Sequence, residues 1–331
     1  MVRKKLQKII ERFSSAKILV VGDIMLDEFV WGKVSRISPE APIPVVEVSS
    51  ETPVPGGAGN VAVNVGSLGA DVNLAGVIGD DAEARILKRE LKVRGVVSSG
   101  LIVDKSRPTT LKRRIIADNQ QVVRMDREEV REVNTALCEK IIDYCRRVIS
   151  DVNGIIVSDY GKGAVTKKLV RELRKLKKKG HLPIAVDPKM GRFERYSWVT
   201  VITPNRHEVE ESQHVLIENE KMLIEAGRNL LRELGCSAIL ITRGEEGMSL
   251  FEKNGSITHV PAVAREVYDV TGAGDTVTST LALSLSCGAT MKEAAIISNY
   301  AAAVVVGKRG TATVTRGELL AILEKADAHF A

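Results

Sequence analysis

The chain has 331 residues, of which 44% are hydrophobic and 27% charged, with a formal net charge of +6. This composition is ordinary for a globular protein and argues against a disordered or fibrous chain. No apolar run approaches the ~20 residues that span a bilayer, so we expect no membrane partner. The basic excess lies largely on one predicted helix at residues 167–179, which is typical of a solvated helix face, so we expect no nucleic-acid partner.

The first fifteen residues predict an amphipathic helix. Leu6, Ile9, Ile10 and Phe13 recur at helical spacing, with basic residues between them. A signal peptide would instead show a short apolar core and a small-residue cleavage site, so we expect a cytoplasmic protein. The four cysteines form no C-x-x-C pair and are expected to be buried thiols.

Short β-branched runs then alternate with longer helical patterns. The predicted strands are Ile18–Val21, Val72–Ile78, Ile155–Val157, Ile184–Val186, Val199–Thr203 and Ala238–Thr242. The predicted helices are Gly59–Leu68, Ala82–Val93, Asn134–Val148, Lys167–Lys179, Lys221–Leu234 and Thr276–Val306, the last interrupted at Gly288. The alternation predicts an α/β fold in which helices cover both faces of a mostly parallel sheet.

Two segments, at about residues 30–48 and 101–126, break this alternation. The first carries Pro39, Pro42 and Pro44, and the second is rich in strand formers and turn residues. Neither could bury a core alone, so we predict antiparallel insertions that form a small β lid on a single domain spanning residues 1–331. Exposed strand edges in such a lid favour pairing across a two-fold axis, and we expect a homodimer through the lid.

The strongest chemical signal is Asp-Val-Thr-Gly-Ala-Gly-Asp-Thr at residues 269–276, which leads directly into a helix. Gly272, Ala273 and Gly274 could form an anion hole, because glycines allow close approach and the N–H groups of a helix start attract anions. Asp275 is interpreted as a general base that takes a proton from a sugar hydroxyl as its oxygen attacks a γ-phosphorus. The alternative is a tight turn in which Asp275 only caps the helix.

Two weaker motifs accompany it. Residues 56–60, Gly-Gly-Ala-Gly-Asn, open a helix and suit close contact with a polyhydroxy ligand, although glycines also serve turns. Asn205 and Glu208 share one helical face after a predicted strand; they suit a hydrated Mg²⁺, or equally a helix cap with its capping-box glutamate. No G-x-x-x-x-G-K-[ST] occurs, which removes the P-loop mechanism, and the missing G-x-G-x-x-G weakens a dinucleotide site.

In this order and spacing, the motifs resemble those of the ribokinase-like (PfkB) carbohydrate kinase family, along essentially the whole chain. The resemblance implies a ribokinase-like three-layer α/β/α sandwich with a β lid, ATP and Mg²⁺ as cofactors, and Asp275 as the catalytic residue. It implies a metal held by Asn205 and Glu208 through water. The implied ATP-binding residues are Asn205, Arg206, His207, Glu208, Thr242, Gly244 and Asn299. The implied substrate-binding residues are Asp27, Arg36, Gly57, Asn60, Lys112, Lys162 and Lys189.

Within the family, Ser35–Val45, Ser158–Gly163, Asp187–Lys189 and Glu266–Gly272 resemble kinases of D-glycero-β-D-manno-heptose 7-phosphate. This resemblance implies phosphorylation at O1 to the 1,7-bisphosphate for ADP-heptose and lipopolysaccharide core synthesis, by a chain without a second nucleotidyltransferase domain. The 7-phosphate needs cations, and the first candidates are Lys189 and Arg36. The full set of candidate cations is Arg36, Lys112, Arg114, Lys162 and Lys189. The alternatives are a kinase of this fold for ribose, fructose 6-phosphate or a nucleoside, and a non-catalytic regulator that binds a sugar or nucleotide.

Overall fold

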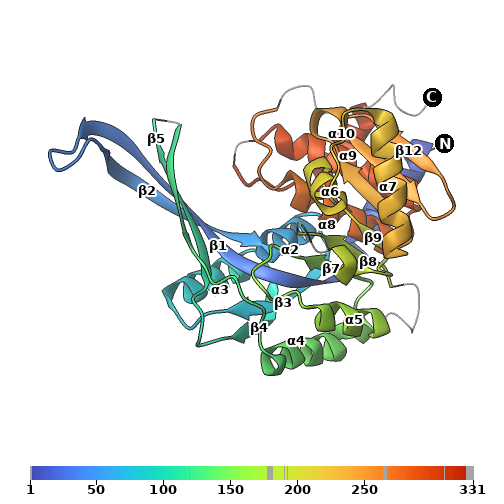
Figure 1. Cartoon of the computed structure of the whole chain (residues 1–331), viewed down its shortest axis with the longest axis horizontal. Helices are drawn as coiled ribbons and strands as arrows, with labels where there is room; N and C mark the ends of the chain where they lie inside the picture. Colours follow the sequence, from blue (N-terminus) through green and yellow to red (C-terminus); the bar gives the residue numbers. More distant parts are fainter. Residues whose placement is uncertain are drawn as a thin grey trace.

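A computed structural model describes residues 2–118, 120–176, 182–189, 191, 193–263, 267–308 and 310–325. Its central sheet joins nine strands side by side (Figure 1). In spatial order they are β12 (Ile257–Val260), β11 (Met248–Glu252), β10 (Ala238–Thr242), β9 (Val201–Ile202), β8 (Ile184–Asp187), β7 (Gly154–Ser158), β1 (Lys17–Ile37), β3 (Asp71–Ile78) and β4 (Val97–Val103). From β10 to β4 neighbouring strands are parallel, whereas β11 and β12 form an antiparallel edge.

Helices cover both faces of this sheet. On one face lie α1 (Val2–Glu11), α2 (Ala58–Ser67), α3 (Ala82–Val93), α8 (Ala273–Ser286), α9 (Met291–Val306) and α10 (Arg316–Lys325). On the other lie α4 (Thr135–Val148), α5 (Lys167–Leu176), α6 (Arg206–Gln213) and α7 (Glu220–Leu234). Short 3-10 helices occur at Arg12–Ser15, Ile149–Asp151, Phe193–Tyr196 and Gly244–Glu246.

The first part of β1 shows why the chain forms three layers. Its alternate residues Ile18 and Val20 belong to one hydrophobic core, while Leu19 and Val21 belong to the other, and all four are fully buried. Successive strand side chains point to opposite faces, so an unbroken apolar run must be covered on both sides. The predicted α/β/α architecture is confirmed.

The lid grows out of the central sheet (Figure 1). β1 continues beyond the body and pairs with β2 (Pro44–Gly57) as a long antiparallel hairpin. β5 (Thr110–Ala117) pairs with the middle of β1 in parallel, and β6 (Gln120–Arg127) pairs with β5 in antiparallel fashion. The lid therefore includes one parallel pair, which the prediction of purely antiparallel insertions did not contain.

Two boundaries differ from prediction. Residues 101–103 belong to β4, which pairs with β3 in the central sheet, so the second lid segment begins at Thr110 rather than Leu101. An apolar run at a sheet edge has the same pattern as a lid strand, because both are only half buried. The predicted helix at 167–179 is described only as far as Leu176, and its last three residues, like Glu266, lie outside the described residues.

The N-terminal helix docks as predicted. Leu6, Ile9 and Ile10 of α1 are buried in the core, and α1 contacts α10. The sequence patterns did not predict α6, α10, β11 or β12, which are short or carry weak periodicity. Within the part of the chain that the structure describes, no helix combines the length and the apolar character needed to cross a membrane.

Candidate active site

Polar residues gather at the carboxyl ends of the parallel strands. A cavity of about 190 Å³ lies there, and its walls come from the ends of β7, β8, β9 and β10 and from the start of α8. Its lining includes the predicted residues Lys189, Asn205, Glu208, Thr242, Gly272, Gly274 and Asp275. Ligands of open α/β sheets bind at this edge, so the position fits a catalytic site.

Asp275 lies in the first turn of α8 and is only 5% exposed. The Asn60 amide donates to its Oδ2 at 2.6 Å, and the Tyr160 hydroxyl donates to its Oδ1 at 2.7 Å. The helix begins after Gly272, which has a φ of 81° and makes no side-chain cap. The alternative in which Asp275 only caps the helix is therefore wrong.

Burial has the largest influence on the pKa of the Asp275 carboxyl. It raises the pKa of Asp275, with a further contribution from the negative charge of Asp27, while the hydrogen bonds from Asn60 and Tyr160 act in the opposite direction. The resulting pKa is about 6. Such a carboxylate is ionised at neutral pH and has a higher proton affinity than an exposed one, as a general base requires.

The predicted anion hole is only partly available. Gly272 and Gly274 line the cavity at the start of α8. The N–H of Ala273 instead donates to the carbonyl of Val270 at 3.2 Å and is thereby engaged. A side-chain carbon on Gly272 would lie 3.1 Å from the Asn60 amide, so the turn can approach α2 closely only without a side chain.

A buried polar network joins the two glycine-containing motifs. Asn64 donates to the Asn60 carbonyl at 3.0 Å, and the Thr276 hydroxyl donates to Asn64 Oδ1 at 2.8 Å. Together with the Asn60–Asp275 bond, these contacts hold α2 against α8. The helix that follows the first glycine motif thus positions the carboxylate of the second.

Asp27 lies where β1 leaves the body for the lid. Arg114 of β5 donates to its Oδ1 at 2.5 Å, and the guanidinium carbon of Arg114 lies 5.4 Å from the centre of the Phe29 ring. A side-chain carbon on Gly56 would lie 2.1 Å from Asp27 Oδ2, and Gly57 has a φ of +56°. The glycines are therefore needed for the backbone to pass this carboxylate.

A second cavity, of about 500 Å³, adjoins the first and shares Thr242 and Gly274 with it. The predicted residues Gly244 and Asn299 also line it, and the rest of its lining is largely apolar, including Val263, Val267, Val270, Val277 and Val306. The Asn299 amide donates to the Pro261 carbonyl at 2.7 Å, which fixes one wall. Its size and apolar character are typical of a ligand pocket.

Asn205 and Glu208 form the capping box of α6. The Asn205 side chain accepts the N–H of Glu208, and Glu208 Oε2 accepts the N–H of Asn205, each at 2.9 Å. Both residues also line the smaller cavity, where burial raises the pKa of Glu208. Arg206 and His207 turn away toward Glu210 and line neither cavity.

The predicted cations differ in position. Lys189 lines the cavity beside Asp275, whereas Lys112 lies 3.6 Å from Asp126 and the Lys162 ammonium donates to Glu128 at 2.6 Å. Arg36 pairs with Val45 near the outer end of the β1–β2 hairpin, beyond the last residue of β1 that β5 reaches (Figure 1). A single chain therefore does not bring Arg36 to the cavity, because the hairpin points away from the body.

Sequence reasoning assigned no role to Tyr160 or Asp187, and it named Arg114 only among the cations that could bind a substrate phosphate. Tyr160 contacts the carboxylate of Asp275, Asp187 lines the cavity, and Arg114 holds Asp27. Burial, together with the charges of Asp275 and Glu208, raises the pKa of Asp187 well above its ordinary value. Two signals were available: Tyr160 and Asp187 lie just after predicted strands, and they belong to the segments Ser158–Gly163 and Asp187–Lys189 that resemble heptose-phosphate kinases.

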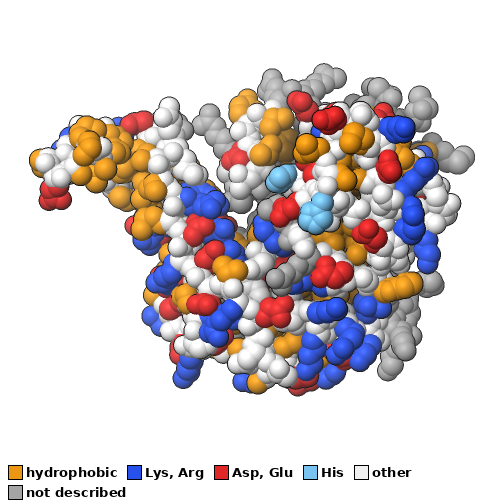
Figure 2. Space-filling model, viewed as in Figure 1, with side chains coloured by type: hydrophobic (Ala, Val, Ile, Leu, Met, Phe, Trp, Pro, Cys, Tyr) orange, Lys and Arg blue, Asp and Glu red, His pale blue; other side chains and the backbone are white. Residues whose placement is uncertain are grey.

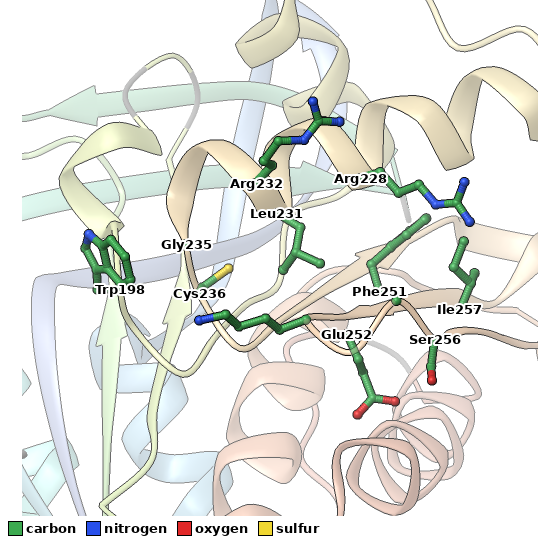
Figure 3. Close-up of a pocket in the computed structure, with 12 residues that line it drawn as sticks. Trp198, Arg228, Leu231, Arg232, Gly235, Cys236, Phe251, Glu252, Ser256 and Ile257 are labelled. Carbon is green, nitrogen blue, oxygen red and sulfur yellow. The ribbon is translucent and has the colours of Figure 1, made fainter.

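Figure 3 shows the residues that line another cavity, of about 490 Å³. Trp198, Leu231, Cys236 and Phe251 line it, near the amino ends of β9 and β10 and thus at the opposite end of these strands from Asp275. It shares no lining residue with the two cavities described above. We therefore assign the chemistry to the Asp275 region.

Solved structures share this fold. The Arabidopsis thaliana ribokinase complexed with ribose and ATP matches with a TM-score of 0.73 and 18% identity, over 93% of this chain and 99% of that chain. The Escherichia coli phosphofructokinase-2 in complex with fructose-6-phosphate matches with a TM-score of 0.78 and 15% identity, over 94% and 98%. These similarities confirm the ribokinase-like fold.

Sequence comparisons identify the family. The bifunctional protein HldE of Geotalea uraniireducens is 44% identical over 321 residues, and that of Citrifermentans bemidjiense is 46% identical over 321 residues. Each alignment covers 97% of this chain and 66% of the relative, so the chain spans just under two thirds of their length. Residues 15–316 match the model described as pfkB family carbohydrate kinase. The chain belongs to the pfkB family of carbohydrate kinases.

Proposed function

We propose that this kinase transfers the γ-phosphoryl group of ATP to O1 of D-glycero-β-D-manno-heptose 7-phosphate, giving the 1,7-bisphosphate for ADP-heptose and lipopolysaccharide core synthesis. The assignment of phosphoryl transfer rests on the buried carboxylate of Asp275, which lies at the start of α8 between Asn60 and Tyr160. The acceptor is supported by the resemblance of Ser35–Val45 and Asp187–Lys189 to heptose-phosphate kinases and by the similarity to HldE proteins.

In the proposed reaction, the sugar binds between the start of the lid and α8. Asp27, Gly57 and Asn60 contact its hydroxyls, and Asp275 accepts the proton of the anomeric hydroxyl as that oxygen attacks phosphorus. The N–H groups of Gly272 and Gly274 stabilise the charge of the transferred group. We infer a cytoplasmic enzyme, since its donor is ATP.

The two adjoining cavities suit the nucleotide. We place the base in the larger, mainly apolar cavity beside Gly244 and Asn299, and the phosphates near Thr242 in the smaller one. Asn205, Glu208 and Asp187 line the smaller cavity, and their side-chain oxygens suit a hydrated Mg²⁺, which prefers oxygen ligands and keeps several waters. When bound, Mg²⁺ would neutralise phosphate charge, and these residues would hold it through water.

The 7-phosphate requires a cation near the acceptor. Lys189 is the first candidate, because it lines the cavity that contains Asp275. Lys112, Lys162 and Arg114 lie nearer the lid but pair with Asp126, Glu128 and Asp27, respectively. We propose that the substrate phosphate is bound by Lys189 together with one of these paired cations.

An ADP-release assay over a panel of acceptors tests the proposed function. Heptose 7-phosphate should support a kcat/KM at least about 100-fold above those of ribose, fructose 6-phosphate and adenosine, because a site built for a phosphate disfavours acceptors that lack one or place it differently. Preference for another acceptor would replace the heptose assignment but keep the kinase. Absence of ADP release with every acceptor would favour the non-catalytic alternative.

We also propose that two copies associate through the lid. The lid exposes large apolar side chains, among them Ile37 (61%), Ile43 (56%) and Val48 (56%). Figure 2 shows hydrophobic side chains gathered over the outer part of the lid, while the body presents mixed charge. Such a patch on a projecting sheet is typical of an interaction site.

A further inference from the structure

We propose that Tyr160 is a positioning residue for phosphoryl transfer, whose hydroxyl fixes the Asp275 carboxylate in the orientation needed to accept a proton. The proposal rests on the proposed function, in which Asp275 is the base. Tyr160 lies in the loop after β7 and donates to Asp275 Oδ1 at 2.7 Å. It lines the cavity without belonging to the motif that contains the base.

The two donors fix the plane of the carboxylate. Asn60 occupies one lone pair of Oδ2 and Tyr160 one lone pair of Oδ1, and both donors come from elements that precede α8 in the chain. Each carboxylate oxygen can accept more than one hydrogen bond, so the acceptor hydroxyl can still donate to a remaining lone pair. Loss of either donor would leave rotation of the carboxylate less restricted.

The loop that carries Tyr160 is itself held from β1. The backbone N–H groups of Tyr160, Lys162 and Ala164 all donate to the carboxylate of Asp23, at 2.8, 2.9 and 2.8 Å. Asp23 is 2% exposed. The neighbouring Asp159 accepts the hydroxyl of Tyr196 at 2.6 Å. This anchoring on both sides places the phenol on a rigid support, as a preorganised site requires.

The charges around Asp275 explain why a neutral donor matters there. Asp27 faces it from β1 and Asp187 from β8, Lys189 follows β8 on the same cavity wall, and Arg114 of β5 is paired with Asp27. Burial and Asp27 raise the pKa of Asp275, whereas the hydroxyl of Tyr160 stabilises its ionised form. Burial and Asp275 raise the pKa of Tyr160 well above its ordinary value, so the phenol remains a donor.

Replacement of the phenol by Tyr160→Phe tests the proposal, because the ring stays and only the hydroxyl is lost. We expect kcat to fall about tenfold, the usual effect of one hydrogen bond to a charged group, with the KM for ATP unchanged within about twofold. The acid limb of kcat/KM should move to higher pH, since the carboxylate loses a stabilising donor. The matched control is Tyr144→Phe on α4, whose hydroxyl lies 3.2 Å from the Ser99 hydroxyl; this variant should keep the wild-type profile.

A second readout does not depend on the acceptor. Carboxyl ¹³C NMR of aspartate-labelled, substrate-free protein, with the Asp275 signal assigned by its loss in Asp275→Asn, should show a higher pKa for Asp275 in Tyr160→Phe than in wild type. If the pKa of Asp275 were the same in Tyr160→Phe and wild type, the proposal would be overturned even if kcat fell. A merely structural role of Tyr160 would leave that pKa unchanged. If wild-type protein phosphorylates no acceptor, the proposed function fails, while the NMR titration still decides the role of Tyr160.

Discussion

At the residue scale, the properties of Asp275 follow from opposing effects on one carboxylate. Burial in the first turn of α8 removes water and raises its pKa, while Asn60 and Tyr160 supply two hydrogen bonds that favour the ionised form. The balance leaves the group charged at neutral pH and able to take a proton. An exposed aspartate at the same place would be a weaker base.

Replacing the base tests this assignment. Asp275→Asn should lower kcat by ~10²–10⁴-fold, the usual contribution of a general base, and should leave the KM for ATP nearly unchanged. The control is Asp80→Asn, since the Asp80 side chain is 60% exposed and lies outside the cavities. If steady-state kinetics showed a near-normal kcat for Asp275→Asn, Asp275 would not be the general base.

The pKa of Asp275 predicts how activity depends on pH. Below pH about 6 the carboxyl is mostly protonated and cannot accept a proton, so kcat/KM should fall about tenfold per pH unit on the acid side. Rate profiles between pH 4.5 and 8 measure this limb. An acid limb centred near pH 4, the ordinary aspartate pKa, would show that burial does not raise the pKa of Asp275.

At the element scale, the strand–turn–helix from β2 to α2 depends on its glycines. Gly56→Ala would put a methyl group 2.1 Å from Asp27 Oδ2 and 2.8 Å from Met25 Cγ, which close-packed surroundings cannot absorb without movement of Asp27. We expect the KM for the sugar to rise about tenfold or more, with a smaller effect on the KM for ATP.

The control for this variant is Gly317→Ala in α10, where an added methyl group meets no atom within 4 Å. Alanine favours a helix over glycine, so this variant should keep wild-type kinetics and an equal or higher Tm. If Gly56→Ala matched it in both measurements, the glycine motif would have no role in sugar binding.

The sequence allowed most elements and the base to be predicted. α3 was predicted with its observed bounds and α7 to within one residue, because their apolar positions recur at helical spacing. Asp275 followed from a local pattern of glycines before a helix. Tyr160 could not be predicted, because its position depends on bonds from its loop to Asp23, which is more than 130 residues away in the chain. Arg36 was misplaced because the direction of a lid hairpin is not encoded in its strand pattern.

At the scale of the whole molecule, the projecting lid carries the proposed association of two copies. Ile37→Asp would place a charge in the apolar lid patch and should convert a dimer to monomers in light scattering coupled to size-exclusion chromatography. Leu216→Asp is the control, because Leu216 is 70% exposed on the body. If both variants kept the wild-type mass, the lid would not be the interface.

The central claim is transfer of the γ-phosphoryl group of ATP to the anomeric oxygen of a heptose phosphate, with Asp275 as the base. ³¹P NMR of the reaction with heptose 7-phosphate tests it most directly, because it reports which oxygen receives the group. We predict a new sugar phosphate resonance coupled to the anomeric proton, beside an unchanged 7-phosphate and an equal amount of ADP. ADP formed without that resonance, or phosphate placed on another oxygen, would contradict the account.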